Sequence, residues 1–147
     1  MFTKKRLIWL GVVLALGLGG WAFLYTLRLW FTESLYSERG SYAFFVTITK
    51  PVIRSFPVRE PEGEVEYHSG CGDGPKPPEQ GVVYRSRLPV AELTAVAERH
   101  IRAHGYAPMH QRGSTGLAFT NGDERVYLAV TPEGDGTAKV DVTLLFD

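Results

Sequence analysis

The sequence predicts an α+β fold. A single N-terminal transmembrane helix precedes a small antiparallel sheet of four to five strands, which one amphipathic helix covers on one face. Three observations lead to this fold class. Residues 7–27 contain no charged side chain, residues 90–104 repeat apolar positions with a helical period, and residues 117–146 alternate with the period of a strand. We therefore expect a membrane anchor followed by one folded domain.

Residues 7–27 are long enough to cross a bilayer as a helix. Twenty-one residues, at about 1.5 Å rise each, match the roughly 30 Å hydrocarbon core of a membrane. A removable signal peptide is the alternative, because the small residues Ala15 and Gly17, with one residue between them, resemble a cleavage site after a short apolar stretch. The apolar run continues past that point through Trp21 to Tyr25. This length favours an uncleaved anchor.

The charges that flank this helix predict its orientation. Lys4, Lys5 and Arg6 precede it, whereas Arg28 alone follows it. Basic residues favour the cytoplasmic side of a membrane helix, so we expect residues 1–6 to form a cytoplasmic tail. The excess of arginine over lysine is typical of GC-rich bacterial genomes. We therefore expect a single-pass protein of the cell inner membrane with a periplasmic C-terminal domain.

A row of small residues marks one face of the predicted helix. Gly11, Ala15 and Gly19 recur at every fourth position. Small side chains in such a row let two membrane helices approach closely, which suggests self-association or a partner helix. The alternative is that glycine and alanine are simply common in membrane helices.

The charge balance argues against nucleic acid as a partner. The first 28 residues carry four basic side chains and no acidic one, so the other 119 hold 12 basic and 16 acidic residues. A mildly acidic domain has no electrostatic reason to bind nucleic acid. We expect the partners to be the lipid bilayer and another membrane or envelope protein.

Residues 28–60 form the juxtamembrane region. We expect the helix to continue to Gly40, followed by a strand over residues 41–49, which are rich in β-branched and aromatic side chains. This stretch is apolar for an exposed linker, so it either lies on lipid, packs under the domain or binds a partner. The candidate partner surface consists of Phe44, Phe45, Val46 and Ile48.

Residues 61–147 predict the extracytoplasmic α+β domain. Its one helix covers residues 90–104, begins beside Pro89 and ends before Gly105, the residue type that favours a left-handed C-terminal position. Alternating apolar residues predict the strands, and Asn121-Gly122 predicts a tight turn between two of them. The predicted strands cover residues 64–69, 82–88, 117–120, 126–130 and 140–146.

Two histidines lie one turn apart on the apolar face of the predicted helix. His100 and His104 could share a metal ion, with His110 as a third ligand. They could also make the domain respond to pH, because a buried imidazole resists protonation. A structural role comes first, since histidine near a helix C-terminus is favoured by the dipole. We assign no metal and no cofactor.

A second group of reactive residues lies in a glycine-rich loop. His68, Cys71 and Asp73 could bind a metal or form a thiol nucleophile with its base. Such groups are normally assembled on a rigid scaffold, so we interpret the loop as an ordinary turn. The alternating acidic residues at 60–66 suggest a solvated strand, a charge-protected edge or a surface for a basic partner.

These features favour a non-enzymatic interaction protein over an enzyme. The expected function is that of a membrane-anchored accessory subunit, adaptor or immunity-type protein in the bacterial envelope. The alternative is a periplasmic domain that senses a metal or pH through His100 and His104.

Overall fold

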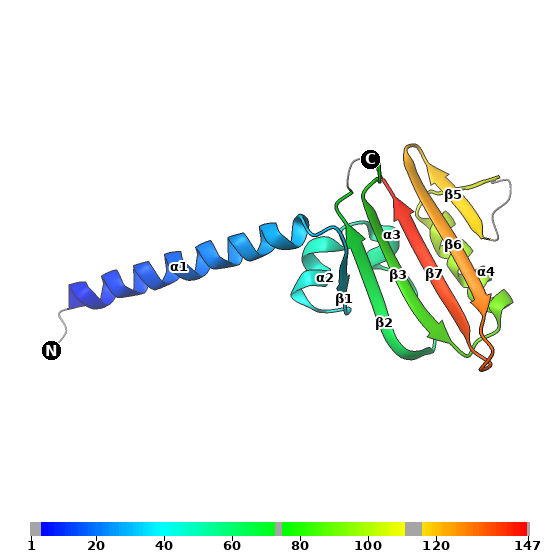
Figure 1. The fold of residues 1–147 in the computed structure, drawn as a ribbon, viewed down its shortest axis with the longest axis horizontal. Coiled ribbons are helices and arrows are strands. Elements are labelled where there is room, and N and C mark those ends of the chain that lie inside the picture. The colour runs from blue at the N-terminus through cyan, green and yellow to red at the C-terminus, as the bar shows by residue number, and fades with distance from the viewer. Residues whose placement is uncertain (1–3, 73–74, 111–115, 147) are drawn as a thin grey trace.

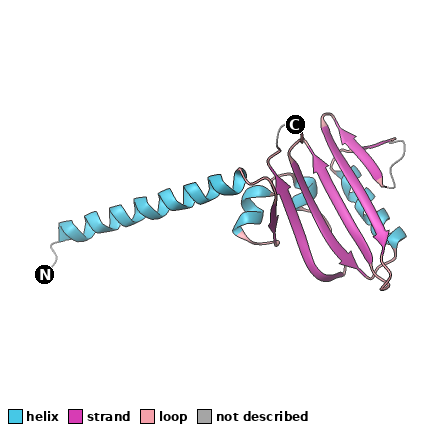
Figure 2. Cartoon of the chain, viewed as in Figure 1, coloured by secondary structure: helices cyan, strands magenta, loops and turns pink. Residues whose placement is uncertain are grey.

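The structure is a computed structural model that describes residues 4–72, 75–110 and 116–146. A long N-terminal helix leads into a sheet with shorter helices packed on it (Figures 1 and 2). The helices are α1 (Lys4–Trp30), α2 (Tyr42–Thr47), α3 (Pro51–Arg54) and α4 (Val90–Ala103). The strands are β1 (Leu35–Ser37), β2 (Pro61–Gly70), β3 (Glu79–Ser86), β4 (Ala107–Met109), β5 (Leu117–Asn121), β6 (Glu124–Pro132) and β7 (Ala138–Leu145).

The strands form one antiparallel sheet in the order β1-β2-β3-β7-β6-β5-β4. The α+β class and the antiparallel sheet are confirmed, but the expected count of four to five strands was wrong, because the sheet has seven. The two additional strands, β1 and β4, occupy the edges and are three residues long. A segment that short shows no detectable alternation in the sequence, so only its pairing with β2 or β5 reveals it.

The juxtamembrane region differs most from expectation. The first helix ends at Trp30 rather than continuing to Gly40, and the segment expected as a strand forms α2. The Ser41 hydroxyl caps α2 by accepting a hydrogen bond from the Phe44 amide at 3.1 Å. Phe44 and Ile48 then lie one turn apart and are both buried. Their burial outweighs the strand propensity of this sequence.

Three helices, rather than the one expected, cover the sheet. Side chains from α2, α3 and α4 meet the inner residues of the sheet in a single hydrophobic cluster. The ribbons of α3 and α4 lie behind the sheet in the view of Figure 1. From the helical side come Phe44, Val52, Ile53, Leu93, Ala97 and Ile101. From the sheet come Tyr67, Val82, Tyr84, Phe119, Val126, Leu128, Val140, Val142 and Leu144. We call this the inner face of the sheet and the opposite face the outer face.

The predicted helix of the domain is confirmed as α4. Gly105 follows it with φ of +89°, as expected for its C-terminal position. Glu98 and Arg102 lie one turn apart with 3.5 Å between Oε2 and Nη2. Helix α4 packs chiefly on β6, so it covers only the half of the sheet that is far from α1. Helices α2 and α3 cover the half of the sheet that is near α1.

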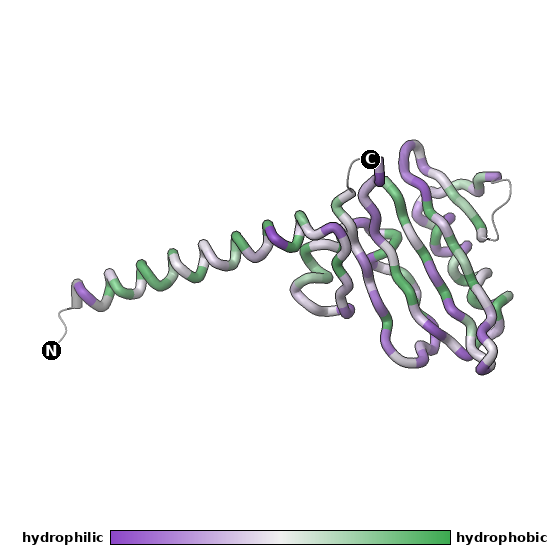
Figure 3. Tube along the Cα trace, in the orientation of Figure 1, coloured by the Kyte–Doolittle hydropathy of each residue, from purple (hydrophilic) through white to green (hydrophobic). Residues whose placement is uncertain are grey.

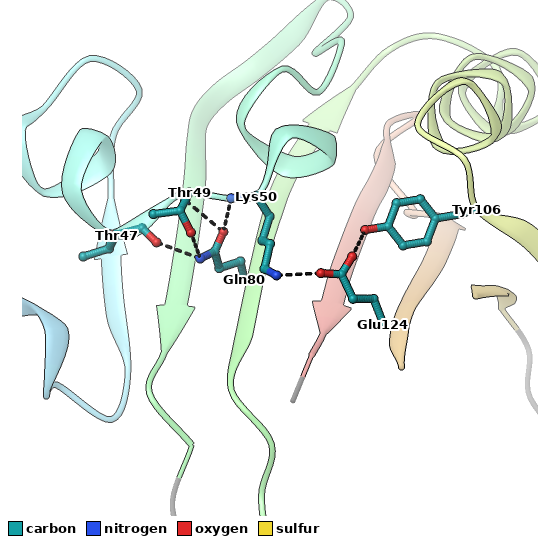
Figure 4. Close-up of polar contacts among 6 residues, drawn as sticks. All are labelled: Thr47, Thr49, Lys50, Gln80, Tyr106 and Glu124. Carbon is teal, nitrogen blue, oxygen red and sulfur yellow. Dashed lines mark hydrogen bonds and ion pairs between the residues drawn. The ribbon is translucent and has the colours of Figure 1, made fainter. Parts of the chain in front are cut away.

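The Gln80 side chain fixes the connection between α2 and α3 to the sheet (Figure 4). Its Oε1 accepts hydrogen bonds from the backbone amides of Thr49 and Lys50, at 3.1 and 3.0 Å. Its Nε2 donates to the Thr47 carbonyl at 2.8 Å and to the Thr49 hydroxyl at 3.0 Å. Gln80 is 5% exposed, so these bonds replace water that cannot reach it.

Lys50 extends the same connection across the sheet. Its ammonium group lies 2.5 Å from Glu124 Oε1 and 4.4 Å from the centre of the Phe146 ring. The Tyr106 hydroxyl donates a hydrogen bond to the other oxygen of Glu124. Burial acts to raise the pKa of the Glu124 carboxyl, but the bonds from Lys50 and Tyr106 outweigh it and lower that pKa. The network joins the α2–α3 connection to β6 and to the residue before β4.

The Gln80 contacts predict a large effect of a single substitution. Replacing Gln80 by leucine removes the partner of two partly buried backbone amides and of the buried Thr47 carbonyl. We expect Gln80→Leu to lower the free energy of unfolding by about 3 kcal/mol. Urea unfolding of the detergent-solubilised chain measures this change.

The control is Lys139→Met, which replaces the charged end of an exposed side chain on the same sheet by an apolar one. We expect it to change stability by less than about 0.5 kcal/mol. Equal stabilities of the two variants would show that Gln80 does not hold the connection.

Candidate functional site at the junction of helix α1 and the domain

Helix α1 projects from the domain without packing against it along most of its length (Figure 3). Its segment Ile8–Trp30 has a mean hydropathy of 1.9, with 0% of its most apolar window buried. It is the one helix among the described residues that is long and apolar enough to cross a membrane. The apolar N-terminal helix expected from the sequence is confirmed. Its length and composition are those of a membrane anchor or a signal sequence.

The end of α1 docks on α2. Leu29 is 7% exposed, in contrast to the exposed apolar residues before it. Thr26 Oγ1 lies 2.6 Å from the Tyr42 hydroxyl. Because the Thr26 hydroxyl already donates to the Ala22 carbonyl, Tyr42 is the donor in this bond. Helix α1 and the domain are therefore joined by packing as well as by the chain.

Aromatic rings surround this junction, and we call them the aromatic collar. Trp21 stacks on Tyr25 with 5.6 Å between ring centres, and Tyr25 stacks on Tyr42 at 6.1 Å. The other members are exposed rings on the last turn of α1, just after it and on α2. The collar comprises Trp21, Tyr25, Trp30, Phe31, Tyr42 and Phe45. Sequence reasoning missed Tyr42, because α2 was not expected to be a helix beside α1.

The structure separates the four residues of the candidate partner surface. Phe44 and Ile48 are 3% and 0% exposed, and both belong to the hydrophobic core. Phe45 is 52% exposed and belongs to the collar. Val46 is half-buried and lines a groove with Leu29 and Trp30. Only two of the four therefore face outward, since alternate residues of a helix do not share a face.

The row of small residues lies on the exposed length of α1. A side chain added at Gly11 or Gly19 would meet no atom within 4 Å. Ala15 lies between them on the same helix and is also exposed. The row is therefore accessible to another helix, and no contact within the chain occupies it at these two glycines.

His100 and His104 face α3, with 4.3 Å between their ring centres. His100 Nε2 donates to the Val52 carbonyl at 2.9 Å, and His104 Nδ1 donates to the His100 carbonyl at 2.9 Å. Burial lowers the pKa of His100, the charge of His104 acts in the same direction, and the bond to Val52 opposes them.

His110 is not part of this pair. It follows β4 and lines a shallow groove with Glu98 and Arg102. Within residues 4–72, 75–110 and 116–146, no three histidine, cysteine or acidic side chains are grouped in a way that could hold a metal ion. The two helical histidines each use one ring nitrogen on a backbone carbonyl, which is an arrangement typical of a structural role.

The residues of the glycine-rich loop lie at different places. His68 is on the outer face of β2, where its ring covers Gly81 and lies 6.3 Å from the Tyr36 ring. Burial lowers its pKa, although Asp141 and Glu79 oppose this effect. Cys71 is exposed beyond the end of β2 and lines the groove beside Trp30. Asp73 lies outside the described residues.

A row of mostly uncharged residues crosses the outer face. The register pairs Tyr36 with His68, His68 with Gly81, Gly81 with Thr143, Thr143 with Tyr127, and Tyr127 with Ala118. None of the described helices covers this face (Figure 1). Sequence reasoning missed the row, because its members become neighbours only through the register of six strands.

The acidic residues at 60–66 flank this row on β2. Glu62 forms an ion pair with Arg87 of the turn after β3, while Glu64 and Glu66 are exposed. Strand β1 pairs only with residues 67–69 of β2, so the first half of β2 is an open edge that carries these charges.

Comparisons with models of protein families, with characterised proteins and with solved structures find no match to this chain.

Proposed function

We propose that the chain is a single-pass protein of the bacterial inner membrane whose periplasmic domain binds another envelope protein. In this role it acts as an accessory subunit, an adaptor or an immunity-type protein and catalyses no reaction. The observation that carries the proposal is the junction between α1 and α2. An exposed apolar helix that is packed against its domain holds that domain in one orientation at the membrane.

The charge distribution supports the orientation of the anchor. Three basic residues at 4–6 precede the apolar segment, and Arg28 lies at its far end. The positive-inside rule then leaves the N-terminus in the cytoplasm and the folded domain in the periplasm. The small-residue row on α1 offers a second contact to a membrane partner.

The outer face of the sheet is the surface that suits a soluble part of the partner. Its central row carries rings at Tyr36 and Tyr127, with the small residues Gly81 and Ala118 among its other members. Tyr36 is 66% exposed. Tyrosine supplies a large contact area at low entropic cost, and it is enriched at the energetic centres of interfaces.

Site-specific photo-crosslinking in intact cells tests this function. A photoreactive phenylalanine analogue replaces Tyr36 or Tyr127 in turn, and the control position is Arg99, which is exposed on α4. We expect one discrete adduct of the same mass from both tyrosine positions and none from Arg99. The absence of adducts from both tyrosine positions would contradict a partner on this face.

The only cysteine of the chain reports whether the domain is where the proposal requires. Cys71 is exposed, so a maleimide that cannot cross membranes labels it in spheroplasts if the domain is periplasmic. Cys71→Ser is the unlabelled control. Labelling that requires lysis would reverse the proposed topology, independently of the crosslinking result.

A pH-sensing domain is the second candidate function, and His100 is the observation that favours it. In the unfolded chain this imidazole titrates near its ordinary pKa of 6.5, whereas burial lowers its pKa in the folded domain. Below about pH 6.5 the unfolded chain therefore binds a proton that the folded domain resists. The stabilising contribution is complete above that pH and is lost as the pH falls toward the lowered pKa.

We expect the melting temperature of the domain to fall between pH 7.5 and pH 5.5. His100→Gln retains a side-chain donor for the Val52 carbonyl and should weaken this pH dependence. His68 has a pKa lowered by burial, so it contributes the part that remains. His110→Gln is the control, because His110 is exposed and should leave the slope unchanged. Identical slopes for all three proteins would remove His100 as the titrating group.

A further inference from the structure

We infer that α2 lies in the headgroup layer of the outer leaflet, with Tyr42 and Phe45 in contact with lipid. The domain is then seated on the bilayer by a second element, instead of standing clear of it on α1. This inference rests on the proposed membrane anchoring of α1. It adds a lipid-binding surface to the folded domain, in which lipid covers the exposed side of α2.

The depth of α2 follows from its attachment to α1. The apolar segment begins at Ile8, and Thr26 lies 18 residues further along a helix that rises about 1.5 Å per residue. Thr26 is therefore about 27 Å from the start of a hydrocarbon core that is about 30 Å thick. The Tyr42 hydroxyl is 2.6 Å from Thr26 Oγ1, which places α2 at the boundary between acyl chains and headgroups.

The side chains of α2 fit that boundary. Its inner side buries Phe44 against the Tyr67 ring, with 4.8 Å between ring centres. Its other side exposes Tyr42 and Phe45 by 53% and 52%. Tyrosine combines an apolar ring with a polar hydroxyl, and such side chains concentrate where a membrane meets water. The short helix is therefore apolar on both sides, with one side for the core and one for lipid.

Arg54 supplies the charge that lipid headgroups require. Its guanidinium lies 5.4 Å from the centre of the Phe45 ring, and its side chain is exposed on α3. A cation held over an interfacial ring can contact lipid phosphate while its aliphatic part covers apolar surface. The Phe45 ring thus faces the acyl chains, and the Arg54 guanidinium faces the lipid phosphates.

Continuity with the anchor favours lipid over a protein partner at this surface. The stack from Trp21 through Tyr25 to Tyr42 runs without interruption from α1 to α2. Trp21 and Tyr25 lie within the apolar segment, where lipid is the solvent. A molecule that contacts Tyr42 at this depth therefore meets the same lipid environment.

Spin labels on the full-length chain in phospholipid vesicles test the inference. In a Cys71→Ser background, single cysteines replace Phe45, Leu18 or Thr131. Leu18 is exposed in the middle of the apolar segment, and Thr131 is exposed at the end of β6. Collision with oxygen reports lipid, and collision with a water-soluble nickel chelate reports water. Unchanged melting temperatures show that the labelled chains fold.

We expect the ratio of oxygen to nickel collisions at position 45 to be several-fold above that at 131 and below that at 18. A ratio equal to that at 131 would overturn the inference while leaving the anchor intact. Protection from both reagents would also overturn it, because protein would then cover the surface. A water-like ratio at position 18 would instead show that α1 does not span the membrane, and both proposals would fail.

Discussion

The burial of residues 44–56 beneath the sheet is the packing on which the rest of the structure depends. Phe44, Ile48, Val52, Ile53 and Phe56 are at most 3% exposed, and they fill the near half of the inner face. Gln80 and Lys50 then hold the backbone of this segment to β3 and β6. Because α1 ends against α2, the same burial also fixes α1 to the domain. A linker in sequence is thus a structural part of the domain.

The elements that could be predicted are those long enough for the apolar residues to show a helical or strand period. The apolar run of α1, the amphipathic α4 and the alternation of β3, β6 and β7 all follow from local patterns. Residues 41–49 were misread, because aromatic and β-branched side chains favour strands until burial selects a helix. Of the candidate site, Phe45 was found from sequence, but Tyr42 and the row from Tyr36 to Ala118 required the tertiary arrangement. Register and docking are set by contacts between distant segments, which no local pattern contains.

The resulting domain has two different faces. Its inner face is closed by three helices, one of which carries the collar residues Tyr42 and Phe45, while its outer face carries a row with rings at Tyr36 and Tyr127. In the proposed function, the packing of α1 on α2 places the exposed side of α2 against lipid and leaves the outer face of the sheet open to a partner. His100 of α4 binds the Val52 carbonyl of α3. A change in the protonation of His100 therefore acts on the segment beneath the sheet.

The central claim is that α1 and the domain form one rigid unit. Distance measurement between two spin labels tests it most directly, with one label at Val13 on the exposed side of α1 and one at Lys139 on β7, in full-length Cys71→Ser chains in nanodiscs. The account predicts a single narrow distance distribution, because α1 packs on α2 and α2 packs on the sheet. A broad distribution, as from a domain that swings on a flexible connection, would contradict it.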